Sequence, residues 1–135
     1  MFYAWAIAVP KNTAESAPVE QVMKLTQGVV TRVEVQFPDG CDGLAHCRIL
    51  QGGHQLWPTL PSTSLVSSGY TIVIDENHEL TGEPFEFKAQ CWNLDDTFPH
   101  TLYVRVGILR GQAAVWILKI FQGLEKFLKL VGIKV

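Results

Sequence analysis

Every segment before residue 110 that has a hydrophobic period has the period of a β-strand. Apolar and polar residues alternate most strictly in residues 29–37, 85–92 and 102–108, and turn-forming residues separate the segments. Parallel strands would need crossover helices between them, and no helical repeat lies in this region. The pattern therefore predicts an antiparallel β-sandwich or small barrel of seven or eight strands.

Eight strands fit a jelly-roll-like β-sandwich. Seven fit an immunoglobulin-like sandwich, although the Cys…Trp…Cys hallmark is missing. Residues 3–9 are apolar on both sides of the strand period, which predicts burial, or near burial, of both faces. The last two strands are expected to pair as a long antiparallel hairpin. We expect strands at residues 3–9, 18–26, 29–37, 44–51, 54–58, 70–75, 85–92 and 102–108, with loops at 60–69 and 76–84.

Length and composition favour a single domain with apolar surface left over. The chain has 135 residues, of which 47% are hydrophobic and 18% are charged, a somewhat apolar balance for a globular protein. The formal net charge of −2 gives no electrostatic reason to expect nucleic acid, which calls for a basic patch. The apolar start of the chain lacks a preceding basic region and is too short for a signal peptide, so the sequence implies no secretion route.

Residues 111–131 form the only long segment with a helical repeat. Apolar residues recur at spacings of three and four, which places them on one face, and a second row widens this stripe. Three lysines and Gln122 occupy the opposite face, and Gly132 is placed to end the helix. We predict an amphipathic assembly helix, with an apolar stripe that forms subunit contacts through Ala113, Ile117, Ile120, Phe121, Leu124, Phe127, Leu128 and Val131.

Four environments suit such a helix: the bilayer core, the bilayer surface, its own sandwich and other helices. Its length, about 31 Å at about 1.5 Å per residue, matches a bilayer core. A central lysine such as Lys119 would cost roughly 2.5 to 3.5 kcal/mol there, so we expect no membrane span. A membrane-surface helix with Trp116 at the headgroups stays open. The wide heptad-like stripe favours packing between subunits, then packing on its own domain, then membrane contact.

Cysteine, histidine and acidic residues form no recognisable metal-binding pattern. Cys41, Cys47 and Cys91 are an odd number and lack the paired short spacing of a zinc site. We expect buried thiols, with one disulfide left open, and surface or loop histidines. Asp95 and Asp96 are expected to bond to the backbone of a turn rather than to calcium. No metal site and no cofactor are predicted.

No catalytic signature occurs in the chain. The serine-rich segment at residues 60–69 lacks a Gly-x-Ser-x-Gly elbow and an evident base, and no Gly-rich phosphate loop opens a helix. We therefore predict that the protein is not an enzyme. Trp92 and Tyr103, on the polar-facing sides of their strands, are candidates for a sugar platform, although packing under loops or at a subunit contact is favoured.

Three phrases of the β region stand out together: VTRVEVQFPDGCDGL, HQLWP and CWNLDDTFPHTLYVRVGIL. In combination they resemble uncharacterised small proteins of phage and prophage type, over most of residues 3–109. This resemblance implies a virion or virion-assembly β-sandwich. Its motifs are structural in kind and include no known catalytic residue, so no site residue is transferred, and it does not extend beyond residue 110.

These patterns together predict a mainly β protein, with a jelly-roll-like sandwich domain at residues 1–110 and a C-terminal assembly helix within residues 111–135. We expect a structural protein, a viral or phage-like virion component that forms a symmetric homo-oligomer or binds other virion proteins. A virion or a cytoplasmic assembly is favoured over secretion. The alternatives are a carbohydrate- or ligand-binding sandwich and a peripheral membrane protein anchored by the helix.

Overall fold

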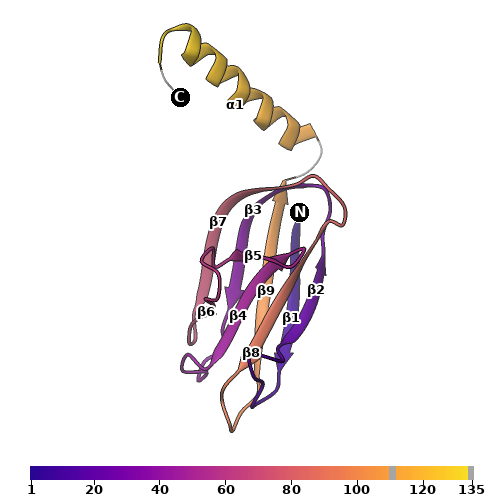
Figure 1. Ribbon diagram of the computed structural model, residues 1–135, viewed down its shortest axis with the longest axis vertical. Coiled ribbons are helices and arrows are strands. Elements are labelled where there is room, and N and C mark those ends of the chain that lie inside the picture. The colour runs from indigo at the N-terminus through magenta and orange to yellow at the C-terminus, as the bar shows by residue number, and fades with distance from the viewer. Residues whose placement is uncertain (110–111, 134–135) are drawn as a thin grey trace.

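The computed structural model describes residues 1–109 and 112–133, and it describes only the backbone of residues 112–115. A β-sandwich fills the described chain up to residue 109, and the helix α1 projects from one end of it (Figure 1). The predicted mainly β fold with a C-terminal helix is confirmed. The elements are β1 (Phe2–Val9), β2 (Val19–Lys24), β3 (Gly28–Gln36), β4 (Ala45–Gln51), β5 (His54–Trp57), β6 (Leu65–Val66), β7 (Thr71–Leu80), β8 (Glu86–Asn93), β9 (His100–Leu109) and α1 (Gln112–Leu130).

Two antiparallel sheets form the sandwich. One has the strand order β1-β9-β3-β7, and the other has the order β2-β8-β4-β5, with the short β6 also pairing to β4. The pairs nest along the chain, because β1 pairs with β9, β2 with β8, β3 with β7 and β4 with β5. At the innermost turn Gly52 and Gly53 both have positive φ, 57° and 80°, as a two-residue hairpin requires.

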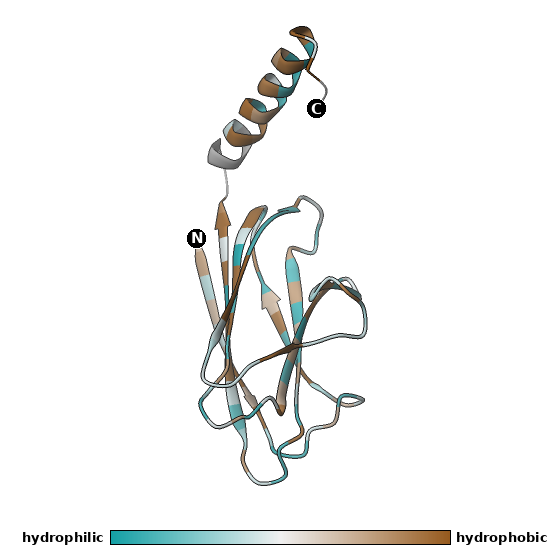
Figure 2. Cartoon of the chain, turned by 90° about the vertical axis from the view of Figure 1, so that its left-hand side faces the viewer, coloured by the Kyte–Doolittle hydropathy of each residue, from teal (hydrophilic) through white to brown (hydrophobic). Residues whose placement is uncertain are grey.

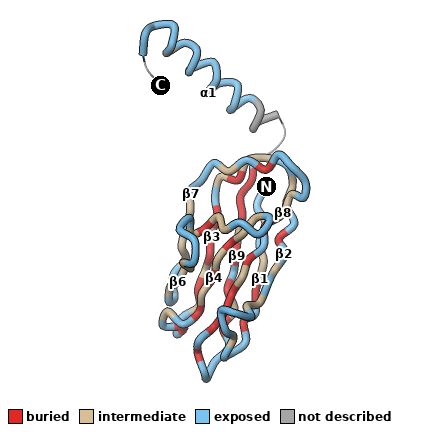
Figure 3. Tube along the Cα trace, viewed as in Figure 1, coloured by how far each residue is buried: buried red, intermediate tan, exposed pale blue. Residues whose placement is uncertain are grey.

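Alternating side chains of both sheets fill the space between them. On the central strands β3 and β9 the inward residues are mostly valine, and Val33, Val35 and Val104 have no solvent exposure. They share one core with Phe87 and Ile49 of the opposite sheet. Hydropathy alternates along the strands (Figure 2), and buried positions alternate with exposed ones in the same way (Figure 3). The period of two in the sequence thus marks the core side of each strand.

The predicted hairpin between residues 85–92 and 102–108 is wrong. β8 pairs with β2 and β4, whereas β9 pairs with β1 and β3 in the other sheet. The turn between them crosses from one sheet to the other. Each of the two strands lies between two partner strands and is strongly buried. Their alternation of apolar and polar residues therefore reflects which face is buried, and it does not show that they pair with each other.

Two predicted loops contain strand. β7 continues as far as Leu80, through the acidic stretch that was expected to be a loop, because its backbone pairs with β3 across a bulge between Val30 and Arg32. β7 is an edge strand of its sheet, so its polar side chains can be solvated while its backbone stays hydrogen-bonded to β3. Within the other predicted loop, Leu65–Val66 form β6 and pair with β4.

β1 is buried on one face only, which contradicts the prediction of two buried faces. Ile7 and Val9 point into the core, whereas Ala4, Ala6 and Ala8 are exposed. Only one side of a two-layer sandwich strand meets the other sheet. Alanine is apolar but small, so its exposure costs little and its presence did not indicate a covering layer.

Candidate functional site

The helix α1 has a well-defined end at Gly132, as predicted. Gly132 has a φ of 85°, and its N–H donates to the carbonyl of Lys129 at 3.2 Å. The N–H of Ile133 donates to the carbonyl of Leu128 at 2.9 Å. These two bonds form a Schellman motif, which satisfies carbonyl groups that the last helical turn leaves free. Local sequence signals therefore specify the helix end without help from the sandwich.

The apolar stripe of α1 is exposed to solvent. Ile120 keeps 65% of its surface exposed, Phe121 64% and Phe127 59%. The side chain of Ala113, which belongs to the predicted contact set, lies outside the described residues. The structure thus places the described stripe residues on α1, with Val131 directly after it, and leaves them largely uncovered. Three further members of the stripe are also exposed, and a fourth is partly buried: Ile117, Leu124 and Val131, and then Leu128.

Exposure of this stripe is energetically unfavourable. Full burial of one large aliphatic or aromatic side chain is worth roughly 1.5 to 3 kcal/mol. Contiguous apolar patches beyond a few hundred Å² are rare on soluble monomers and mark interaction sites when they occur. Trp116 and Leu130, which are also exposed, extend the apolar surface of the helix at both ends. The helix is therefore the strongest candidate for a functional surface in the described chain.

The opposite face of α1 is charged and stays compatible with water. Lys129 Nζ lies 2.9 Å from Glu125 Oε1, one helical turn away. Lys119 Nζ lies 5.6 Å from the centre of the Trp116 ring. Exposed pairs of this kind contribute little to stability. Their effect is to keep this face solvated while the apolar stripe is available for contact.

A groove of about 380 Å³ lies where the start of the helix approaches the rim of the sandwich. Apolar side chains of α1 face polar groups of β7 across this groove. The part of the stripe beyond Phe121 does not line it, so the sandwich rim covers at most the beginning of the stripe. The groove is lined by Val29, Thr31, Asn77, Glu79, Leu109, Ile117, Leu118 and Phe121.

The two predicted ligand aromatics lie in different sheets. Trp92 on β8 is only 3% exposed, because the His46 ring stacks on it at 5.1 Å and the Arg48 guanidinium lies 4.9 Å from its centre. Tyr103 on β9 is 42% exposed, beside Arg105. The structure does not bring the two rings together, so they do not form one sugar platform.

His46 is held by its neighbours rather than aimed at a ligand. Its Nδ1 lies 2.8 Å from the Ser64 hydroxyl, which β6 positions beside β4. Burial lowers the pKa of His46, and the negative charge of Glu15 opposes that shift. The arrangement covers Trp92 and joins β6 to the sheet.

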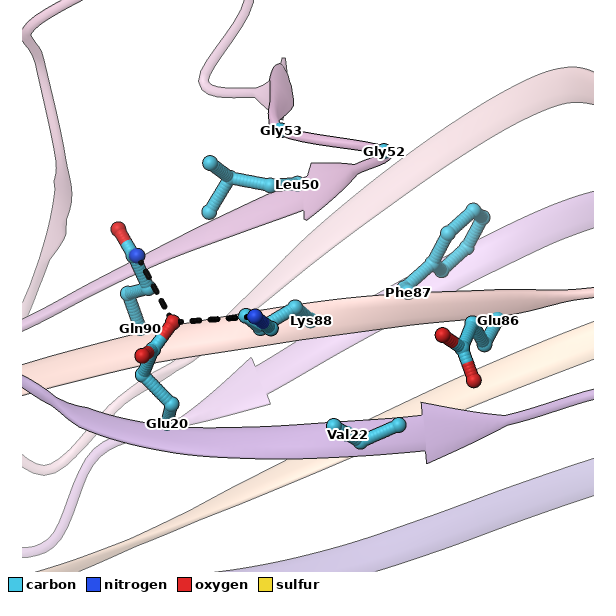
Figure 4. A pocket seen from close by; sticks show the side chains of 9 residues that line it. All are labelled: Glu20, Val22, Leu50, Gly52, Gly53, Glu86, Phe87, Lys88 and Gln90. Atoms are coloured by element: carbon cyan, nitrogen blue, oxygen red, sulfur yellow. Dashed lines mark hydrogen bonds and ion pairs between the residues drawn. The ribbon is translucent and has the colours of Figure 1, made fainter. Parts of the chain in front are cut away.

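A smaller groove of about 180 Å³ lies between β2, β8 and the β4–β5 turn (Figure 4). Glu20 Oε2 accepts a hydrogen bond from Gln90 at 3.1 Å and lies 3.4 Å from Lys88 Nζ (Figure 4). The Gln90 hydrogen bond and the Lys88 charge lower the pKa of Glu20. The volume is below the range of small-molecule sites, about 300 to 1,000 Å³, so we assign no ligand to this groove.

The turn between β8 and β9 is exposed except for Asp95, whose side chain is buried beneath it. Asp95 Oδ1 accepts hydrogen bonds from the N–H groups of Thr97 at 2.8 Å and Phe98 at 3.2 Å. Asn93 Nδ2 donates to the Phe98 carbonyl at 2.9 Å. The predicted bonding to the turn backbone is confirmed for Asp95, whereas Asp96 accepts a hydrogen bond from the Thr97 hydroxyl instead. The expectation of surface or loop histidines is wrong for His100, which is buried on β9 and bonded to Asp95.

The cysteines are buried free thiols, as expected. Cys47 and Cys91 oppose each other on β4 and β8, with sulfur atoms 3.4 Å apart. The hydrogen bond with Cys91 and burial raise the pKa of Cys47. Among the described residues, no group of three or more His, Cys, Asp or Glu side chains is arranged to hold a metal ion. In that same part of the chain, no helix is long and apolar enough to cross a membrane.

No protein-family model and no curated protein sequence matches this chain. Support for a function therefore comes from the geometry of its own residues. The exposed stripe of α1 is the feature that the sandwich itself does not explain.

Proposed function

We propose that this protein is a structural subunit that assembles into a symmetric homo-oligomer through α1, as a component of a viral or phage-like particle. One observation carries the proposal: the apolar stripe of α1 is exposed, while the sandwich already has a filled core of its own. A surface of this kind needs a covering partner, and other copies of the same helix supply one of matching chemistry.

The shape of the stripe favours several helices rather than its own sandwich. Ile120, Leu124 and Phe127 repeat at spacings of four and three, with Phe121 and Leu128 in a second row beside them. A single seam suits two helices, whereas a stripe of two rows suits a bundle of more. The groove at the sandwich rim involves the stripe only as far as Phe121, so the rest remains free for such a bundle.

We propose that the strands of the sandwich follow a jelly-roll topology. Its support is the nested pairing of strands, in which the first pairs with the last and the innermost two pair with each other. A doubled ribbon wrapped in this way gives two four-stranded sheets, the form common in capsid subunits. The virion setting is the part of the proposal that rests on the sequence resemblance alone, and the geometry carries only the self-assembly.

The mass in solution tests the assembly role. We expect the full chain to form an oligomer, and a chain that ends at residue 110 to form an assembly with fewer subunits. Sedimentation equilibrium measures both masses directly. If the two proteins have the same number of subunits, α1 does not drive assembly and the proposal fails.

The second candidate function is that of a peripheral membrane protein. The charged face of α1 favours it, because Lys119, Lys126 and Lys129 outnumber Glu125, and the exposed Trp116 suits the headgroup region. Flotation with vesicles that contain anionic lipid separates the two functions, since an assembly helix buried in a bundle stays with the unbound protein. The carbohydrate-binding alternative has less support, because Trp92 and Tyr103 lie in different sheets.

A further inference from the structure

β1 is an edge strand, and it differs from the other edge strands in its composition and length. β7 carries three acidic residues, β2 carries Glu20 and Lys24, and the four-residue β5 is followed by Pro58. Charge, proline and short length are the usual means by which sheet edges avoid pairing with other chains. β1 is eight residues long and contains no charged residue and no proline, although Pro10 follows it as Pro58 follows β5 (Figure 2, the strand that begins at N).

The hydrogen-bond pattern shows which backbone groups of β1 are free. The Met1 amino group donates to the Ile108 carbonyl, and the Ile108 N–H donates to the Met1 carbonyl, both at 2.7 Å. Such doubly bonded pairs alternate along an antiparallel ladder, so Tyr3, Trp5 and the following odd-numbered residues also bond to β9. The N–H and C=O groups of the even-numbered residues therefore point to the free margin: Phe2, Ala4, Ala6 and Ala8.

Three of these four residues are alanines, and their side chains are exposed. A small side chain leaves the free backbone groups open to the close approach of another strand. Tyr3 and Trp5, on the core side, are only partly buried and stack on each other with ring centres 5.8 Å apart. The margin thus combines backbone groups that no other described strand pairs with and an incompletely covered aromatic pair.

We infer that β1 is a second self-association surface, which pairs antiparallel with β1 of another copy and joins two four-stranded sheets into one. This inference rests on the proposed self-assembly, since it names the same partner, but it uses a different element. One two-fold register engages all four free residues, with Phe2 opposite Ala8 and Ala4 opposite Ala6 of the partner copy. Trp5 then faces its own copy across the two-fold axis, where side chains of non-hydrogen-bonded pairs approach most closely.

The test uses the full chain with Ile120→Asp and Leu124→Asp, so that α1 no longer contributes to assembly. We expect this protein to remain a dimer in sedimentation equilibrium. Adding Ala6→Pro should reduce its mass to half. The substitution removes an N–H that β9 does not use, and the proline ring blocks the free margin.

A charge at the same position gives an independent result if proline disturbs folding. Ala6→Lys should also halve the mass, whereas Val73→Lys, at an exposed position on the opposite margin β7, should leave the dimer intact. Circular dichroism checks that each variant keeps its strand signal. A dimer that survives both Ala6 substitutions overturns the inference.

Amide exchange in the dimer tests the register. The N–H groups of Phe2, Ala4, Ala6 and Ala8 should exchange slowly, and the Ala6→Lys monomer should lose this protection. Fast exchange at these positions in a dimer overturns β1 pairing.

The outcomes separate the two interfaces. If the full chain is an oligomer and the Ile120→Asp, Leu124→Asp protein is a monomer, the β1 inference fails and α1 assembly stands. If both are dimers that Ala6→Lys dissociates, α1 assembly fails and the β1 inference stands.

Discussion

Nε2 of His100 lies 2.9 Å from Oδ2 of Asp95, within the turn that carries the chain from one sheet to the other. The other carboxylate oxygen accepts two backbone N–H groups of the same turn. With Asn93 these are the buried polar and charged residues of the described chain, and each has hydrogen-bond partners. The crossing between the sheets therefore depends on specific polar contacts rather than on apolar packing.

The first prediction concerns the pH dependence of this turn. The Thr97 N–H bond, followed by the His100 contact, lowers the pKa of Asp95. A carboxyl group with a lowered folded-state pKa adds stability above its unfolded pKa, about 3.9, and this stability is lost as the pH falls through the folded-state pKa. Asp95→Asn should therefore lower the urea midpoint at pH 7. The difference from the unsubstituted protein should shrink as the pH falls from about 3.9 through the folded-state pKa of Asp95.

Asp96 provides the control for this prediction. Its side chain is exposed and accepts only the Thr97 hydroxyl among the hydrogen bonds of the described residues. Asp96→Asn should change the urea midpoint little at either pH. An Asp95→Asn effect of equal size at pH 7 and in strong acid would show that the charge of Asp95 does not stabilise the turn.

The second prediction concerns thiol reactivity. Cys47 and Cys91 are completely buried, and the pKa of Cys47 is raised, so little reactive thiolate is accessible in the folded protein. Iodoacetamide at pH 8 should leave both residues unmodified in native buffer and modify both in denaturant. Peptide mass mapping measures the two cases, and rapid labelling of either residue in the native protein would contradict the packing of β4 against β8.

The third prediction concerns the core of the sandwich. Leu102 on the central strand β9 has no solvent exposure, so Leu102→Ala should destabilise the protein by about 2 to 5 kcal/mol through lost burial and a cavity. Leu94→Ala makes the same chemical change at an exposed position and should cost far less. Equal losses in urea unfolding would place Leu102 outside the core.

The fourth prediction concerns the apolar stripe of α1. Ile120→Asp with Leu124→Asp should reduce the oligomer mass while the strand signal in circular dichroism and the unfolding midpoint of the sandwich persist. Gln122→Asp introduces one negative charge on the opposite face and should leave the mass unchanged. If the stripe substitutions unfold the sandwich instead, α1 belongs to the core of its own domain.

Several parts of the fold could be predicted because their causes are local. The alternation in residues 29–37 and 102–108 identified strands, and turn-forming residues marked the breaks between the segments. Gly132 identified the helix end because it alone there accommodates a positive φ cheaply. Each of these features depends on residues within a few positions of one another.

The errors involve contacts between distant residues. Strand alternation states which side of a strand is buried, but it does not state which strand lies beside it, so β8 and β9 were paired wrongly. His100 is buried because it lies on the core side of β9, opposite Val9 of β1, and Ala6 is exposed because it lies on the outer face of β1, away from the other sheet. Neither is visible in the local pattern.

The sequence by itself determined the main strands, the antiparallel class and the amphipathic character of the helix, because hydrophobic period and turn chemistry act over short range. Only the tertiary structure decided the nested strand order, the two margins of each sheet and the exposure of the α1 stripe. Strand partners are chosen by burial and register over the whole chain, and a residue is exposed or covered according to what lies opposite it. For that reason the free backbone groups of β1 became evident only in the folded chain.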